Sequence, residues 1–141
     1  MSVRINKGVI VDVDGTLAIM NGRGPFEWTK VYQDMVNEPV ADLVRRLKTS
    51  GLSVIIVTGR DGSALEDTKK WLNDNSIPFD AIYSRPAKNF EKDSIIKKRI
   101  YNTNIRDSWD IQFVLDDRNQ VVKMWREEVG LPVFQVADGN F

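Results

Sequence analysis

The sequence predicts an α/β fold in which helices cover both faces of a parallel β-sheet. Short apolar runs rich in β-branched residues alternate with amphipathic helical patterns along the chain, as in strand–helix–strand units. The apolar runs are nearly continuous, which is typical of strands that are buried on both faces. The length of 141 residues suits one hydrophobic core. We therefore expect a single domain over residues 1–141.

Five segments are predicted to be strands because apolar runs end at turn-forming or polar residues. The first, residues 8–13 (GVIVDV), ends at the turn dipeptide Asp14-Gly15. The others are expected at residues 52–57, 79–83, 111–115 and 131–136.

Helical patterns fill the intervals between the strands. Asn37 is expected to begin a helix that has Pro39 in its first turn and ends near Gly51. The remaining helices are expected over residues 61–74, 90–101 and 117–129. Residues 18–36 combine glycines, a proline and several aromatics, which indicates an ordered loop or a short β-flap.

The composition excludes several kinds of chemistry. The chain has no cysteine and no histidine, so thiolate chemistry and Ser-His-Asp triads are ruled out, and acid–base work must fall to carboxylates or lysines. Its formal net charge is +0, so nucleic acid would have to be bound through local contacts. No apolar run approaches the length of a membrane span, and we expect a cytoplasmic protein without membrane contact.

Polar residues follow three of the predicted strands directly. The carboxyl ends of parallel strands meet at one edge of a sheet, where ligands bind. Each residue alone also has a purely structural explanation, as a turn, a helix lead-in or a helix cap. Carboxylates gathered at one edge repel one another unless a cation holds them, and an all-oxygen set favours Mg²⁺. The residues concerned are Asp12, Asp14, Thr58, Asp116 and Asp117.

Three motifs resemble those of haloacid dehalogenase (HAD) phosphatases. VIVDVDGTLA is similar to motif I of that family, IIVTGR to motif II and FVLDD to motif IV. The resemblance implies a HAD-like Rossmannoid three-layer sandwich with a minimal, flap-type cap. It also implies a motif III lysine between the last two motifs, for which Lys92 is the best match and Lys88 the alternative.

The resemblance assigns roles to the motif residues. Asp12 would attack phosphorus and form an aspartyl-phosphate, and Asp14 would protonate the leaving oxygen and later activate water. Mg²⁺ would be held by the Asp12 carboxylate, the Asp14 backbone carbonyl and Asp116.

The family also implies groups that bind the phosphoryl oxygens. These would be the Thr58 hydroxyl and the backbone N–H groups of Gly15 and Thr16, while Lys92 would offset negative charge.

The substrate is indicated by a missing cap and by a closer resemblance. The intervals 12–58 and 58–92 hold no room for a globular cap, which predicts an open site for a large substrate. From residue 9 to residue 141 the chain resembles the 3′-phosphatase domain of T-even bacteriophage polynucleotide kinase/phosphatases. DVDGTLAIMNGRGPF, VTGRDGS, LDDRNQVVKMWR and FQVADGNF carry this likeness.

That likeness implies a polynucleotide 3′-phosphatase in nucleic-acid end repair, acting on 3′-phosphorylated DNA or RNA ends and on 2′,3′-cyclic phosphates. By position, Arg23, Arg60, Asp117 and Arg118 match residues that the family uses on its substrate. The chain has no P-loop motif, so no 5′-kinase activity is expected within it. It could be a stand-alone protein, with a separate kinase or ligase of a repair pathway as its partner, or a domain of a longer enzyme.

Other features have plainer interpretations. The basic run of residues 97–99 is expected to be a solvated helix face rather than a phosphate contact. Trp71 and Trp125 lie at helical core spacing, and Trp28 in the flap is the tryptophan considered for substrate stacking.

Two other functions stay open at this point. One is a HAD phosphatase for a small phosphomonoester such as a nucleotide, and the other is a catalytically inactive module that binds nucleic-acid ends. The sequence leaves DNA and RNA equally open.

Overall fold

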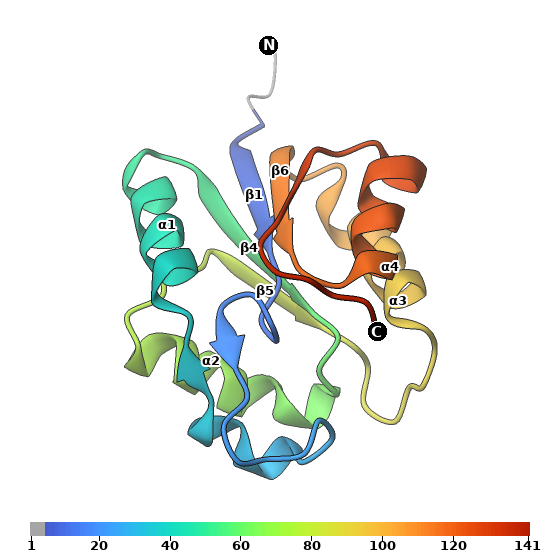
Figure 1. Ribbon diagram of the computed structural model, residues 1–141. Coiled ribbons are helices and arrows are strands. Elements are labelled where there is room, and N and C mark those ends of the chain that lie inside the picture. Colours follow the sequence, from blue (N-terminus) through green and yellow to red (C-terminus); the bar gives the residue numbers. More distant parts are fainter. Residues whose placement is uncertain (1–4) are drawn as a thin grey trace.

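The architecture is known from a computed structural model that describes residues 5–141. Its main feature is a five-stranded sheet in the order β5-β4-β1-β6-β7, in which every pair of neighbours is parallel (Figure 1). The predicted strands are thus confirmed, with shifts of a few residues at their ends. Their bounds are Lys7–Val11 (β1), Ser53–Thr58 (β4), Ala81–Ser84 (β5), Asp110–Asp116 (β6) and Val133–Gln135 (β7).

The register of the sheet aligns the carboxyl ends of its three central strands. Val11, the last residue of β1, pairs with Ile56 of β4 and with Leu115 of β6. The residues that follow therefore leave the sheet at the same edge. This is the physical reason why motifs far apart in sequence meet in one place.

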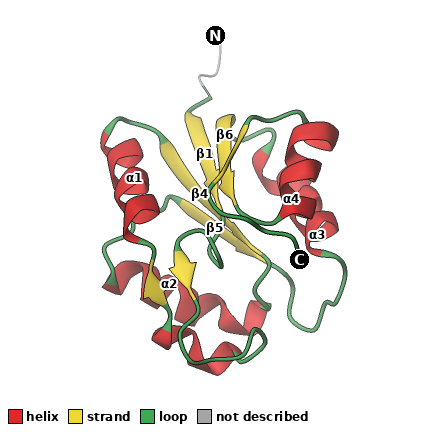
Figure 2. Ribbon diagram, in the orientation of Figure 1, coloured by secondary structure: helices red, strands yellow, loops and turns green. Residues whose placement is uncertain are grey.

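Helices form a layer on each face of the sheet, as Figure 2 shows. On one face, α1 (Glu38–Thr49) and α2 (Leu65–Asp74) cover a core that includes Val9, Val11 and Ile56. On the other, α3 (Asp93–Ile100) and α4 (Asn119–Lys123) cover a core that includes Ile10 and Ile55. Successive strand residues point to opposite faces, so each strand contributes to both cores. The fold is the predicted three-layer α/β sandwich.

The helix ends differ from the predictions in places. Helix α3 begins at Asp93, later than expected, and continues through a wider π-helical segment, Tyr101–Ile105. Helix α4 likewise continues through Met124–Val129. Asn37 precedes α1 as predicted, but its side-chain amide donates to the backbone carbonyl of Thr16 at 2.9 Å instead of capping the helix.

The segment between β1 and α1 is a small flap. Strands β2 (Ala18–Ile19) and β3 (Met35–Val36) pair in antiparallel fashion, and a 3-10 helix, Trp28–Gln33, lies between them. Trp71 of α2 donates its indole N–H to the carbonyl oxygen of Asp34 at 3.0 Å, which fastens the flap to the sandwich. Of the two structures considered for residues 18–36, the short β-flap is therefore confirmed. Within residues 5–141, no helix has the length and apolar character that crossing a bilayer requires.

Candidate active site

Three buried carboxylates converge at the carboxyl edge of the sheet. Asp12 follows β1, Asp116 ends β6 and Asp117 comes next, and one oxygen from each lies within 4.8 Å of the others. Burial, then the charge of Asp116, raises the pKa of Asp12 well above its usual value, and burial likewise raises the pKa of Asp117. Like charges thus meet in a poorly solvated place. The expected gathering of carboxylates is real for Asp12, Asp116 and Asp117, whereas the Asp14 side chain lies outside the cluster.

The cation beside this cluster is Lys97, and the prediction of Lys92 or Lys88 was wrong in position. The Lys97 ammonium donates to Asp12 Oδ1 at 2.8 Å and to Asp116 Oδ2 at 3.0 Å, with a side chain that is 1% exposed. Lys92 instead precedes α3 and is exposed, and so is Lys88. Helix α3 starts only at Asp93, so Lys92 lies before it, whereas Lys97 shares the buried face of the helix with Ile96 and Ile100.

The charge of Lys97 is well stabilised. Burial lowers the pKa of its ammonium, but the charges of Asp116, Asp12 and Asp93 outweigh burial and hold that pKa well above its usual value. The lysine is therefore a permanent positive charge within hydrogen-bonding distance of the carboxylate predicted to be the nucleophile.

Asp14 belongs to a second, separate ion network. Arg60 donates from Nη2 to Asp14 Oδ1 at 2.8 Å and from Nε to Oδ2 at 3.1 Å, and Arg23 donates to the same Oδ1 at 3.2 Å. Behind them, the buried Asp34 accepts from Arg60 at 2.6 Å and from Arg23 at 2.7 and 3.0 Å. Two carboxylates and two guanidiniums thus balance one another, and they fix the Asp14 side chain.

Arg23 does not point into the site in the way the sequence suggested. Its side chain is completely buried, and its third nitrogen is directed at the backbone carbonyls of Gly24 and Pro25. The Asp34 hydrogen bond, despite burial, raises the pKa of Arg23. Every guanidinium nitrogen is engaged within the protein, and Arg23 supports Asp14; its contact with a substrate phosphate stays a prediction.

The expected backbone donors are also engaged elsewhere. The N–H of Gly15 donates to the Ala18 carbonyl at 2.8 Å, and the N–H of Thr16 donates to the Val13 carbonyl at 3.1 Å. These bonds close the tight turn after β1, and the prediction that both groups bind phosphoryl oxygens is not supported. Thr16 contributes its hydroxyl instead, which donates to Asp12 at 3.2 Å and lies 3.3 Å from Asp117.

Gly15 has a steric role in the same turn. Its φ is +81°, and a Cβ at this position would lie 2.1 Å from an oxygen of Asp117. Only glycine permits both the backbone conformation and the approach of Asp117 to the cluster. The glycine of the motif is thus explained by packing against a carboxylate from the other end of the chain.

An open cavity of about 460 Å³ lies over these groups. Asp12, Asp14 and Thr58 line it, together with Arg60 and Arg118. Thr58 is buried, and its hydroxyl accepts from the Arg60 backbone N–H at 3.2 Å, which leaves its proton free to be donated. Arg118 is half-buried and lies 3.7 Å from Asp93. The predicted Asp12, Asp14, Thr58, Arg60, Asp116, Asp117 and Arg118 are therefore brought to one cavity.

Sequence reasoning missed Asp34, Asp93 and Lys97. A signal existed for the last two, because Asp93 and Lys97 are four positions apart on one helix face and Lys97 lies next to the apolar Ile96. A lysine on the buried side of a helix must have an anionic partner. Asp34 carried no signal, since its importance comes from flap geometry alone.

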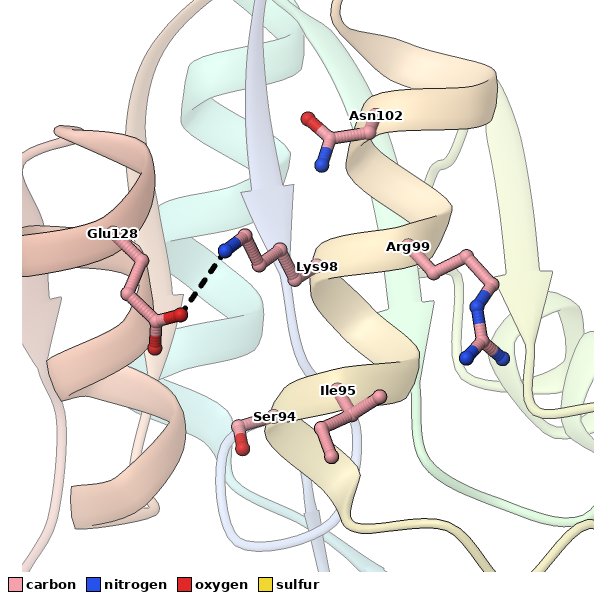
Figure 3. A pocket seen from close by; sticks show the side chains of 6 residues that line it. All are labelled: Ser94, Ile95, Lys98, Arg99, Asn102 and Glu128. Carbon is pink, nitrogen blue, oxygen red and sulfur yellow. Dashed lines mark hydrogen bonds and ion pairs between the residues drawn. The ribbon is translucent and has the colours of Figure 1, made fainter.

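The rest of the basic run has the solvated role that was predicted for it. Lys98 pairs with Glu128 at 3.0 Å and Arg99 pairs with Glu91 at 2.8 Å, both at the surface. Figure 3 shows Lys98, Arg99 and Glu128 around the hollow that they line beside α3. Both of its cations are matched by carboxylates, so the hollow offers no free charge to a phosphate backbone.

The tryptophans divide as predicted. Trp71 and Trp125 are buried in the two cores, while Trp28 lines the cavity and lies under the Arg23 guanidinium at 5.8 Å.

Comparison with known proteins assigns this site to a family. Residues 6–141 match the family described as the polynucleotide kinase PNKP phosphatase domain, a HAD family. The chain belongs to this family. The expected resemblance to HAD phosphatases and to polynucleotide kinase/phosphatases is therefore confirmed.

Individual relatives agree with this assignment. The chain is 29% identical over 134 residues to a protein of Autographa californica nuclear polyhedrosis virus that is named as a bifunctional polynucleotide kinase/RNA ligase. It is 41% identical, with a TM-score of 0.95, to a chain in the structure of a Pnkp1/Rnl/Hen1 complex. A class C acid phosphatase from Bacillus anthracis shares the fold at 13% identity and a TM-score of 0.64.

The chain is much shorter than the first two relatives. The alignment with the viral protein covers 93% of this chain but 19% of that protein. The alignment with the chain in the complex covers 99% of this chain but 49% of the other. The chain therefore matches only part of each of these proteins.

Proposed function

We propose that the protein is a Mg²⁺-dependent phosphomonoesterase that removes 3′-phosphates from DNA or RNA ends through an aspartyl-phosphate on Asp12. The observation that carries the proposal is the pairing of two sites in one cavity: the buried cluster of Asp12, Asp116 and Asp117 beside Lys97, and Asp14 held by two arginines. The family to which the chain belongs supports a phosphatase of the HAD type.

The chemistry follows from the two aspartates that face the cavity. An Asp12 oxygen attacks phosphorus and forms a P–O bond, while the bond from phosphorus to the 3′ oxygen breaks and Asp14 gives that oxygen its proton. The Asp14 carboxylate then takes a proton from water, which attacks the same phosphorus, releases phosphate and restores Asp12. Both proton transfers are assigned to Asp14 because the chain has no histidine.

The donor set fits a divalent metal ion. When all three are ionised, Asp12, Asp116 and Asp117 carry three negative charges against the single positive charge of Lys97, which leaves two charges for a bound cation to match. Carboxylate oxygens that approach one another this closely are the ligands that Mg²⁺ prefers. When bound there, Mg²⁺ would neutralise charge on the phosphoryl group, and Asp12, Asp116 and the Asp14 backbone carbonyl are the proposed ligands, with Asp117 as a fourth candidate.

The remaining cavity residues position and balance the reacting groups. The Thr58 hydroxyl has a free proton for a phosphoryl oxygen, and Lys97 keeps an Asp12 oxygen oriented by a hydrogen bond of 2.8 Å. Arg60 and Arg23 hold Asp14 in one rotamer, which fixes the direction of proton transfer. Arg118 is the half-exposed cation available to a substrate phosphate.

Two observations support a nucleic-acid end as the substrate. The cavity is open and carries no globular cap, so a polymer can enter from the side. One relative is named as a bifunctional polynucleotide kinase/RNA ligase, and a similar chain belongs to a Pnkp1/Rnl/Hen1 complex. We propose a kinase or ligase of an end-repair pathway as the functional partner.

The test is phosphate release from a 3′-phosphorylated oligonucleotide and from a 3′-mononucleotide, with and without Mg²⁺. We expect turnover of the oligonucleotide that stops with a chelator and returns with Mg²⁺, and loss by several orders of magnitude in Asp12→Asn. Asp12→Asn is nearly isosteric, so circular dichroism should show an intact fold. Preference for the mononucleotide would favour a small-molecule phosphatase, and absence of turnover on both would favour an inactive binding module.

A further inference from the structure

The mouth of the cavity carries two unusually exposed aromatic side chains. Phe26 is 83% exposed and Phe90 is 93% exposed, yet both line the cavity that holds Asp12 and Asp14. Phe26 belongs to the flap and Phe90 to the loop between β5 and α3, so they come from different parts of the chain (Figure 1). Large apolar rings left in water at the entrance to a reactive site indicate a contact with substrate.

The flap ring has a rigid support. Phe26 packs edge-on against Trp28, with ring centroids 6.2 Å apart and an interplanar angle of 80°. Trp28 in turn lies against the Arg23 guanidinium, which is fixed by two hydrogen bonds to Asp34. The position of Phe26 is therefore tied to the ion network that holds Asp14.

The loop ring is supported from both sides of the chain. Arg85 donates to the carbonyl oxygens of Asn89 at 3.1 Å and of Glu91, and the Glu91 N–H donates to the Asn89 side chain at 2.8 Å. Glu91 is also held by Arg99 through two hydrogen bonds. Phe90 is thus displayed by a loop whose backbone is fastened immediately before and after it.

The charges of the site indicate what these rings bind. Arg23 and Arg60 are taken up by Asp14 and Asp34, and the whole chain has a formal net charge of +0. Apart from the half-exposed Arg118, little positive charge is left in the cavity to hold a phosphate backbone, so much of the affinity for a nucleic acid must come from apolar contacts. Nucleobases offer a π-face to aromatic rings whatever their identity.

We propose that Phe26 and Phe90 stack on the bases at an unpaired 3′ end and so select single-stranded ends. This inference rests on the proposed function and adds the form of the end that is preferred. In a duplex, base faces are covered by neighbouring pairs, and a cavity of about 460 Å³ suits one nucleotide-sized group rather than two strands. An unpaired terminal nucleotide can place its phosphate over Asp12 while its base, or the next one, meets the rings.

The experiment compares Phe26→Ala, Phe90→Ala and the double variant with wild type. Tyr32→Ala is the matched control, because Tyr32 is an aromatic flap residue that is 70% exposed and lies outside the cavity lining. Each protein is assayed on a 3′-phosphorylated single strand, on the same strand in a blunt duplex, and on acetyl phosphate, which has no ring to stack. Binding of the single strand is measured separately by fluorescence anisotropy in an Asp12→Asn background.

Replacing an aromatic ring that stacks on a base by alanine lowers affinity by about 5- to 150-fold. We expect each phenylalanine variant to lose at least about fivefold in single-strand binding and in kcat/KM, mainly through KM, with a far smaller effect on acetyl phosphate. The wild type should favour the single strand over the blunt duplex by about tenfold or more, and Tyr32→Ala should match it.

The inference would be overturned if the double variant bound and hydrolysed the single strand as well as wild type does. It would also be overturned if kcat/KM fell equally on the single strand and on acetyl phosphate. These results leave the proposed function standing if the oligonucleotide is still hydrolysed. If single-strand binding depends on both rings but the wild-type protein releases no phosphate, the stacking site is supported and the proposed activity is refuted.

Discussion

Removal of the Lys97 ammonium is the sharpest perturbation of the candidate site. We choose Lys97→Met, which keeps the length and apolar body of the side chain but deletes the charge. Two charge-assisted hydrogen bonds are lost, at 2.8 Å to Asp12 and 3.0 Å to Asp116. Each is worth about 1.5–3 kcal/mol, and loss of one partner from a buried ion pair costs about 3–5 kcal/mol.

The lower end of that range applies here. Burial and the charge of Asp116 already raise the pKa of Asp12, so this carboxyl can take up a proton when the lysine is gone. We therefore expect a loss of about 3 kcal/mol in the free energy of unfolding without metal, or roughly 10 °C in Tm for a chain of this size. Loss of a preorganised charge beside the nucleophile should lower kcat by about 10²- to 10³-fold.

The assay is Mg²⁺-dependent phosphate release, together with urea unfolding in a chelator. The matched controls are Lys98→Met, one position along the same helix at the surface, and Lys92→Ala, the lysine that the sequence favoured. Both variants should stay within about twofold of the wild-type kcat and within about 0.5 kcal/mol of the wild-type free energy of unfolding. Wild-type turnover by Lys97→Met, or a loss in Lys92→Ala of the same size, would refute the assignment.

Three further perturbations test other parts of the site and its surroundings. Asp14→Asn should reduce turnover of a sugar phosphate far more than that of nitrophenyl phosphate, whose leaving group needs little protonation; equal losses in steady-state kinetics would contradict the proton-donor role. Asp34→Asn removes the buried negative charge that pairs with Arg23 and Arg60, and it should lower the free energy of unfolding by about 3–5 kcal/mol in urea titrations. An unchanged free energy of unfolding would mean that the buried network contributes no stability. Pairing with Arg99 and Asn89 lowers the pKa of Glu91 from 4.5 to about 2, so its stabilising effect is present above pH 4.5 and lost as the pH falls toward 2. The Tm difference between Glu91→Gln and wild type should accordingly shrink over that interval, and a constant difference would show that the charge is irrelevant.

Most of the fold could be predicted because each strand carries its own signal. The apolar runs at residues 52–57 and 111–115 are buried on both faces, and turn residues or carboxylates end them, so their type and order follow from local sequence. The meeting of Asp12 with Asp116 then follows from parallel pairing alone. This part of the site depends on topology, which the strand–helix alternation determines.

What could not be predicted depends on where individual side chains point. Lys97 looked like one member of a solvated basic run because Lys98 and Arg99 follow it directly, and its partners Asp12 and Asp116 are distant in sequence. The hydrogen bonds from Arg23 to the buried Asp34 of the flap were not foreseen either. No local pattern marks such long-range ion pairs, since they form only after the flap has packed on the sandwich.

The parallel pairing of β1 with β6 also determines at which stage of folding the site forms. Thr16 and Asp117 touch across 101 positions of chain, so the cluster closes a loop that spans most of the protein. Closing so long a loop costs entropy that no early local contact repays, and contacts of this kind form late in folding. During synthesis, a chain that has reached only the end of α3 already carries Asp12, Asp14, Thr58 and Lys97 but has no β6 to complete the sheet edge. Asp12 and its carboxylate neighbours therefore come together only when β6 docks beside β1, and partly made chains lack the complete cluster.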